Sequence, residues 1–385
     1  MHQKFIIAVC AVLLGACVHT PPAVVSGPAQ AVSPDAGRDT ARVTHRFYAN
    51  RDYGSEAQFN PFSLIVNGGY DQLRTGDHRQ VFSLWYRSGM HSVWHSVTDP
   101  EPVLRHYGWR NWLTHEVFPL SLKGSGGGQW YPNYHLHLIA GGMTYARTVE
   151  WYEQHGVTSH PELAAGATVY AWHVLTEIVE TSASCCEDED GLTDLLIFDS
   201  GSIMLWNQAW IKRLFDSGRL EFTDWPGQPT LSMPGKRLEN AYMMAMFRAP
   251  IPRSEHWKVM TTMGNAFLVG FSRQLTPKLW ASAAAGWDPA ENPVVDPRTG
   301  ARTATVLPNA GFFIDRDGSL LLSYINKGGG DNGPTINLYP GVLGHGPFSP
   351  GLWLQKNRDG GVRFGIVSRI GVGLGWYSHT TPGRP

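Results

Sequence analysis

The chain has 385 residues, with 31 lysines and arginines against 32 aspartates and glutamates, and charged residues make up only 16% of it. A formal net charge of −1 without a basic cluster gives no electrostatic footprint for nucleic acid, so we exclude that class of partner. The 15 tryptophans suit either a large aromatic core or a surface that contacts a membrane or a glycan.

The first residues predict export from the cytoplasm. Lys4 precedes an apolar run over residues 5–14, which is about half the length of a bilayer span and is typical of a secretory signal. Gly15 and Ala16 stand directly before Cys17. This arrangement resembles the lipobox of bacterial lipoproteins, which implies cleavage after Ala16 and attachment of lipid to Cys17.

The residues after Cys17 predict the destination of the protein. Val18 stands where an aspartate is the usual signal for retention in the inner membrane. The resemblance therefore implies an outer-membrane lipoprotein, bound to the membrane through its N-terminal lipid, with its body facing the periplasm. Residues 17–46 are rich in proline, alanine, valine and serine without hydrophobic periodicity, so we predict a flexible tether after a signal peptide at 1–16.

The body of the chain divides at about residue 236. From 47 to 235 apolar residues recur with helical spacing, whereas from 236 to 385 short β-prone runs alternate with glycine, proline and aspartate turns. We therefore predict two domains and an α+β fold class. A mainly helical domain, an N-terminal bundle, is followed by an antiparallel β-rich domain that forms a sandwich or a small barrel, complete or incomplete.

Helices are predicted over 83–97, 102–117, 133–154, 161–181 and 190–206, and segment 59–69 is either a strand or a helix. Hairpins are predicted around Asp317-Gly318 and Asp359-Gly360, because Asp-Gly favours a tight turn, and a third between 266–271 and 280–285. The glycine alternation over 365–376 resembles that of outer-membrane strands.

Two cysteines lie in the body of the chain. Cys185 and Cys186 are adjacent in an acidic segment, so they can form a vicinal disulfide, bond to another chain or stay free. No histidine accompanies them in sequence, which makes them poor candidates for a zinc site.

A group of histidines and acids on the predicted helices is the best candidate for chemistry. His173, Glu177 and Glu180 have the spacing i, i+4 and i+7, which places them on one helix face as a weak candidate metal-binding set. The preceding helix offers His137, and the following one offers Asp194 and Asp199.

The residues alone leave three interpretations of this group open. It binds a metal ion, it performs acid-base catalysis, or it forms a structural polar network in which Arg147 neutralises Glu177 and His137 bonds Asp194. No strict metal-binding signature such as His-Glu-x-x-His is present to decide between them.

Segments 133–143, 175–177 and 194–199 look like an uncharacterised family of Gram-negative envelope proteins with a domain of unknown function. Over residues 132–215 they are also distantly similar to VanZ-like proteins, in which a histidine, an acidic residue and an aspartate recur on three successive helices. The resemblance implies that His137, Glu177 and Asp194 are the polar triplet, and it implies no agreed reaction.

We expect from this sequence a non-catalytic lipid-anchored envelope protein without a cofactor, which has a structural or interaction role at the outer membrane. Its partner would be an outer-membrane protein or a glycan. The alternative is a membrane-surface enzyme that acts on lipid, lipopolysaccharide or peptidoglycan, with His137, Glu177 and Asp194 as its catalytic residues.

Overall fold

The computed structural model describes residues 46–74, 80–119, 131–184, 189–233, 235–289, 294–295, 302–303, 306–327, 333–344, 346, 348–357 and 360–378. They belong to one compact unit, His45–Pro385. The predicted signal peptide, the lipid attachment at Cys17, nearly all of the tether and the pair Cys185 and Cys186 lie outside the described residues.

Helices fill the first part of the unit, and three of them have π-helical hydrogen bonding. In chain order they are η1 (Ser55–Gln58), α2 (Pro61–Gly69), η2 (Asp71–Arg74), η3 (Val81–Ser83), α3 (Tyr86–Thr98), α4 (Pro100–Tyr107), α5 (Trp109–Asn111), the π-helix η4 (Trp112–Val117), the π-helix η5 (Tyr131–Gly141), α6 (Gly142–Gln154), α7 (Pro161–Ser184), α8 (Glu189–Thr193), the π-helix η6 (Asp194–Asp199), α9 (Ser200–Trp206) and α10 (Ala209–Asp216).

The predicted helices are present, but one is interrupted and two contain π-helical stretches. The segment 102–117 is divided at Gly108, whose φ of 92° is a left-handed conformation that ends α4. The segments 133–154 and 190–206 are continuous, yet each contains a π-helical stretch. The undecided segment 59–69 is the helix α2, which begins at a capping box between Asn60 and Ser63.

Replacing Asn60 with alanine is expected to lower the free energy of unfolding by about 1 kcal/mol. The Asn60 side chain accepts a hydrogen bond from the Ser63 N–H at 2.9 Å and donates one to the Ile370 carbonyl at 3.0 Å. Urea unfolding of the purified variant measures the change. Asn60→Asp keeps the acceptor for Ser63, so it should lose less than alanine, and equal losses would contradict the cap as the cause.

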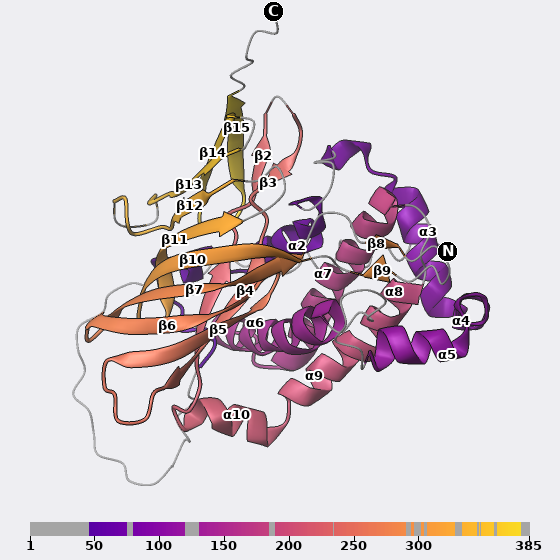
Figure 1. Cartoon of the computed structure of the whole chain (residues 1–385), viewed down its shortest axis with the longest axis horizontal. Helices are drawn as coiled ribbons and strands as arrows, with labels where there is room; N and C mark the ends of the chain where they lie inside the picture. Colours follow the sequence, from indigo (N-terminus) through magenta and orange to yellow (C-terminus); the bar gives the residue numbers. More distant parts are fainter. Residues whose placement is uncertain are drawn as a thin grey trace, which may run out of the picture. The chain divides into compact units, whose positions relative to one another are not determined.

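Strands fill the second part. They are β1 (Glu221–Pro226), β2 (Thr230–Ser232), β3 (Leu238–Glu239), β4 (Met243–Pro250), β5 (Trp257–Gly264), β6 (Phe267–Thr276), β7 (Leu279–Pro289), β8 (Val294–Val295), β9 (Arg302–Thr303), β10 (Val306–Arg316), β11 (Ser319–Lys327), β12 (Thr335–Leu338), β13 (Gly351–Lys356), β14 (Val362–Val367) and β15 (Gly373–Ser378). All but β8 and β9 form one mostly antiparallel 13-stranded sheet, so the fold class is α+β (Figure 1).

The sheet contains the hairpins expected from the sequence. Strands β6 and β7, β10 and β11, and β13 and β14 pair as antiparallel neighbours. Asp317 and Gly318 have φ values of 51° and 82°, as a two-residue hairpin turn of this hand requires. Strand β1 begins at Glu221, ahead of the predicted boundary at residue 236, because this short segment joins the sheet by pairing with β4.

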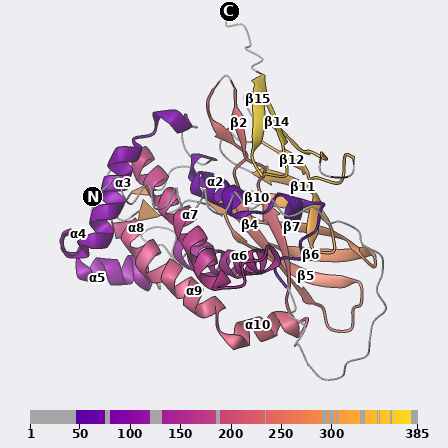
Figure 2. The ribbon, with the colours of Figure 1, turned by 180° about the vertical axis from the view of Figure 1, so that it is seen from behind.

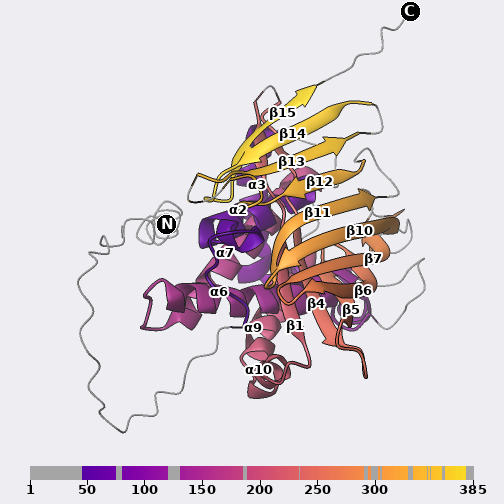
Figure 3. The same ribbon diagram turned by 90° about the vertical axis from the view of Figure 1, so that its left-hand side faces the viewer.

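The sheet curves until part of it closes. The order is β1-β4-β5-β6-β7-β10-β11-β12-β13-β14-β15-β2-β3, and β1 also pairs in parallel with β11. Seven strands, from β1 and β4 to β11, thus form a closed circuit of pairings. Figure 3 shows the strands from β5 to β15 side by side, with the helices on one side of the sheet.

Strand β4 separates two cores. Met243, Ala245 and Phe247 pack against the helices in one cluster, whereas Met244 and Met246 belong to a second cluster inside the closed circuit. Successive side chains of a strand point to opposite faces, so an uninterrupted buried apolar run is what a strand between two cores needs. The helices therefore cover the outer face of the circuit at β4.

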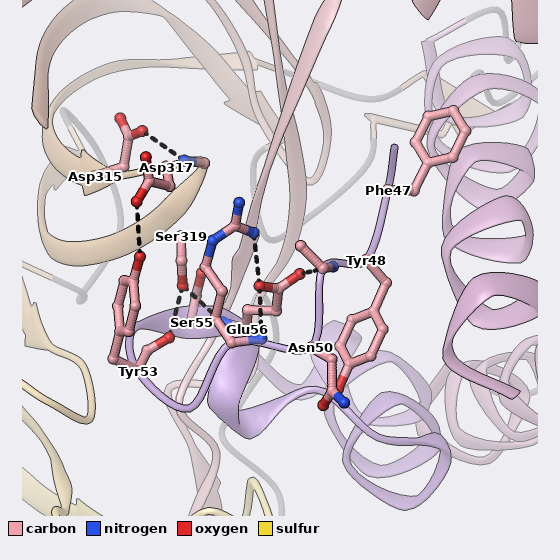
Figure 4. A network of polar contacts seen from close by, with 12 residues as sticks. Phe47, Tyr48, Asn50, Tyr53, Ser55, Glu56, Asp315, Asp317 and Ser319 are labelled. Atoms are coloured by element: carbon pink, nitrogen blue, oxygen red, sulfur yellow. Dashed lines mark hydrogen bonds and ion pairs between the residues drawn. The ribbon is translucent and has the colours of Figure 1, made fainter. Parts of the chain in front are cut away.

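The first described residues attach to the turn between β10 and β11 (Figure 4). The Ser319 hydroxyl donates to the Tyr53 carbonyl at 2.9 Å and accepts from the Glu56 N–H at 3.1 Å. The Tyr53 hydroxyl donates to Asp317 Oδ2 at 3.1 Å, and Arg51 donates to the Glu56 carboxylate at 2.8 Å. The chain is thus fixed to the sheet near the start of the compact unit.

Candidate functional site

Three helical segments bring the predicted site residues together. The π-helix η5 carries His137, α7 carries His173 and Glu177, and the π-helix η6 begins at Asp194 and ends at Asp199. Helix α7 packs against α6 and contacts η6, and η5 contacts η6 as well. Figure 2 shows α7 beside α6, with α8 and α9 following along the same group of helices.

The π-helical turns of η6 explain why two aspartates of one helix share a site. In a π-helix the hydrogen bonds run from i to i+5, so residues five apart lie nearly above one another. In an α-helix the same separation turns the second residue well away from the first. Asp194 and Asp199 are five residues apart, and both contact His137.

His137, His173 and Asp199 place three ligand atoms at the corners of a nearly regular triangle. His137 Nδ1 lies 3.0 Å from His173 Nδ1 and 3.0 Å from Asp199 Oδ1. His173 Nδ1 lies 2.9 Å from the same Asp199 Oδ1. Three potential ligand atoms thus converge from three helical segments.

A second group shares His137 with the first. Its Nε2 atom lies 3.2 Å from Asp194 Oδ2. The ligand atoms of His137, Glu177 and Asp194 all lie within 4.8 Å of one another, as do those of His137, His173 and Asp199. The structure therefore brings together the three nominated residues of the polar triplet, and it adds Asp199.

Two nominated or discussed residues do not join these groups. Glu180 is in neither group, although its charge acts on His137 and Glu177. The guanidinium carbon of Arg147 lies 3.6 Å from the ring centroid of Phe59. Of the predicted structural network, the contact between His137 and Asp194 is present, and Arg147 packs on an aromatic ring.

The cluster is closed to solvent, yet some of its polar atoms have no hydrogen-bond partner. The side chains of His137, His173, Asp194 and Asp199 are at most 5% exposed. Within the described part of the chain, no hydrogen bond reaches His173 Nε2, Asp194 Oδ1 or Asp199 Oδ2. A buried polar atom without a partner is costly, so these three atoms destabilise the site in the absence of another group.

Burial and mutual repulsion raise the pKa values of two of the acids. Burial, followed by the charges of Glu180 and Asp190, raises the pKa of Glu177 well above its ordinary value. Burial and then the charge of Asp190 raise the pKa of Asp194 in the same way. Carboxyl groups this crowded cannot all ionise without a compensating cation.

The two histidines and Asp199 behave as a coupled set. Burial lowers the pKa of His137, but the Asp199 carboxylate together with the charges of Asp190 and Glu180 outweighs it, so the pKa is raised. The pKa of His173 is lowered, chiefly by burial. The two imidazoles hold the pKa of Asp199 below its ordinary value despite burial. The described groups that shift these pKa values are acids and histidines, with no lysine or arginine among them.

The donor set fits a divalent transition-metal ion. Neighbouring ligands of an octahedral ion, bound at about 2.1 Å, lie about 3 Å apart. Two imidazoles and one carboxylate on one face form a facial triad, which leaves the remaining coordination positions open. The Nε2–H of His137 can donate to Asp194 while Nδ1 faces the ion, and such a carboxylate fixes the tautomer of a ligating histidine.

Comparisons with known proteins identify no family for this chain. No protein-family model matches the chain, and the searches of curated proteins and of solved structures gave no match. Among the helices that the structure describes, none combines the length and apolar character needed to cross a membrane.

Proposed function

We propose that the protein is a non-catalytic, lipid-anchored envelope protein whose helices form a bundle around one divalent transition-metal ion. The ligands are His137, His173 and Asp199, and the lipid is on Cys17. The ion stabilises the helical part of an outer-membrane lipoprotein. The observation that carries the proposal is the triangle of two Nδ1 atoms and one Oδ1 atom, with sides of 2.9 to 3.0 Å.

The triangle is difficult to satisfy with protons alone. If both Nδ1 atoms carry a proton and donate to Asp199, two N–H groups are crowded together with their nitrogen atoms 3.0 Å apart. If one of them does not, its lone pair faces the Asp199 carboxylate. A cation accepts all three lone pairs at once and also compensates the surrounding acids.

The burial of the site favours a structural role for the ion. A catalytic metal site keeps a coordination position that substrate or water can reach, and a site sealed from solvent offers no such access. The exposed fraction of each ligand side chain is 5% or less, so the ion would be held away from solvent.

Metal analysis of the purified full chain tests the proposal. After dialysis against Zn²⁺, Mn²⁺ or Fe²⁺ and removal of free ion, we expect about one equivalent of bound metal per chain. A chelator should lower the unfolding temperature, because an ion that binds only the folded state at a hundred times its Kd stabilises it by about 2.7 kcal/mol. Substoichiometric metal together with an unchanged unfolding temperature would overturn the proposal.

Graded variants separate ligands from supporting residues. Asp199→Asn and His173→Gln should lose the bound metal. Asp194→Asn, which acts through His137, should weaken affinity by about 10- to 100-fold. His95→Gln, an exposed histidine on α3, is the matched control and should bind like the wild type. In chelator, Asp199→Asn should be no less stable than the wild type, which shows that it folds.

A second candidate function, a metal-dependent hydrolase, rests on Glu177. Its carboxyl group lies within ligand reach of His137 and Asp194, and the triad leaves coordination positions open where water could bind. Glu177 would then be the general base. Incubation of the metal-loaded protein with phospholipid vesicles, lipopolysaccharide and peptidoglycan decides between the two. Turnover that Glu177→Gln abolishes without loss of metal supports the hydrolase and refutes the non-catalytic proposal.

A further inference from the structure

The outer face of the sheet carries a continuous row of apolar side chains. Directly paired residues run from Val259 on β5 to Trp376 on β15 across nine adjacent strands. This central row includes Phe271, Phe312, Ile336, Leu354 and Phe364, and the remaining members are an alanine on β7 and a tyrosine on β11. No member is charged.

The neighbouring row has the same character. It runs from Ile314 on β10 through one leucine each on β11, β12 and β13 to Ile366 and Leu374. In the other direction the row continues from β10 through β7 to β6, where Arg273 is its single charged member. The apolar side chains of both rows are exposed to solvent: Phe271 is 55% exposed, Leu354 48% and Ile366 46%. Soluble proteins rarely expose an apolar surface of this extent.

The opposite face of the same strands is buried, and it carries polar groups beside the apolar cluster that contains Met244 and Met246. Arg248 on β4 donates to Asp315 on β10 and to Ser272 and Ser282 on the strands between them, and all four side chains are at most 2% exposed. Farther along the sheet, Arg363 pairs with Glu239 at 3.1 Å. A sheet with one face in water usually exposes polar side chains, so the apolar character of the exposed face is the unusual feature of this sheet.

The curvature of the exposed outer face of the sheet restricts what can cover it. The strands from β5 to β11 belong to the closed circuit, so their outer face is convex. At β4 the helices already cover this face, with Phe247 in their cluster, and the apolar surface continues from there. Trp257 and Trp287 lie toward opposite ends of the band, about 20 Å apart along the strands.

We propose that this outer face, from β5 to β15, contacts the hydrocarbon interior of a lipid bilayer. A fluid apolar phase can follow a surface that extends over nine strands and is convex from β5 to β11, whereas a second protein would need a matching concave one there. Tryptophans at the limits of the band suit the two sides of a membrane interface. The predicted lipid on Cys17, close in sequence to the start of the compact unit at His45, would hold the sheet at the membrane.

Photolabelling of the full chain in vesicles tests this contact. The purified protein is reconstituted in phosphatidylethanolamine and phosphatidylglycerol vesicles that contain a phosphatidylcholine with a diazirine near the end of its acyl chain. After irradiation, mass spectrometry locates the labelled peptides. Labels are expected on peptides from 267–287, 306–316 and 351–378, which supply the outer face of the sheet.

Two other outcomes would overturn the proposal. Labels confined to the N-terminal peptide would mean that lipidation alone attaches the protein to the membrane. Absence of lipid labels from the sheet peptides, together with a dimer of the chain in analytical ultracentrifugation, would mean that the face is covered by a second copy of the chain. The test does not depend on the proposed metal site, because it can be run with and without chelator.

Matched charge variants sharpen the test. Leu354→Glu combined with Ile366→Glu should reduce lipid labelling of the sheet by roughly tenfold, because a charge is strongly disfavoured in hydrocarbon. Phe82→Glu combined with Met204→Glu changes side chains that are each 69% exposed but lie outside the sheet, and it should leave the labelling unchanged. Circular dichroism in detergent shows that both variants fold, and equal labelling of the two would overturn the proposal.

Discussion

Replacing Asp315 with alanine is expected to lower the free energy of unfolding by about 3–5 kcal/mol, because it leaves a buried guanidinium without its counter-ion. Asp315 Oδ2 accepts from Arg248 at 3.1 Å, and a second contact joins the other carboxylate oxygen to the same guanidinium. Both side chains lie inside the closed circuit and are at most 2% exposed. Urea unfolding in detergent measures the loss.

A double variant isolates the uncompensated charge as the cause. Arg248→Met combined with Asp315→Leu removes both charges and keeps similar volume, and buried ion pairs can often be replaced in this way without loss. It should therefore be much more stable than Asp315→Ala alone. A double variant as unstable as the single one would show that packing in the circuit, and not the unpaired charge, sets the cost.

Replacing Gly142 with alanine is expected to destabilise the protein by about 1–3 kcal/mol, although alanine is the better helix former. Gly142 is the first residue of α6, where it faces Trp206 of α9. A Cβ at this position would lie 2.0 Å from Trp206 Cδ1, and the indole is only 4% exposed. The ring cannot move away without disturbing the helical core.

Gly166→Ala is the matched control for this prediction. Gly166 lies within α7, and its nearest neighbour to an added Cβ would be Ile203 Cδ1 at 4.0 Å. Here the helix propensity acts without a clash, so the variant should be about 0.5–1 kcal/mol more stable than the wild type. Changes of the same sign at both positions would contradict the contact with Trp206 as the reason.

Local sequence signals predict much of this fold. The apolar spacing around α3, α6 and α7 and the turn at Asp317 and Gly318 determine elements from neighbouring residues alone. The closure of the sheet depends on a pairing between Asp224 and Ser319, which are far apart in sequence. No local pattern records such a contact, so the arrangement of the strands could not be predicted.

The candidate site likewise could be predicted only in part from the sequence. The spacing of His173 and Glu177 on one helix face, and the resemblance that nominates His137 and Asp194, lead to residues that do converge. The sequence offers Asp199 on the same predicted helix as Asp194, but the triplet that the resemblance nominates does not contain it, and α-helical spacing would turn it away from Asp194. The position of Asp199 depends on the π-helical hydrogen bonds of η6, and no established sequence pattern predicts such hydrogen bonds.

The parallel pairing of β2 with β15 has a consequence for the order in which the chain is made. Leu231 on β2 pairs with Leu374 on β15, so β2, which is synthesised in the middle of the chain, cannot pair with β15 until the end of the chain has been made. Contacts this distant in sequence slow folding, because the loop between them must close first. A chain that is still being synthesised therefore lacks the partner that completes the sheet. Until residues 373–378 emerge, β2 and β3 have only each other, which makes the nascent chain a client for chaperones that shield unpaired strand edges.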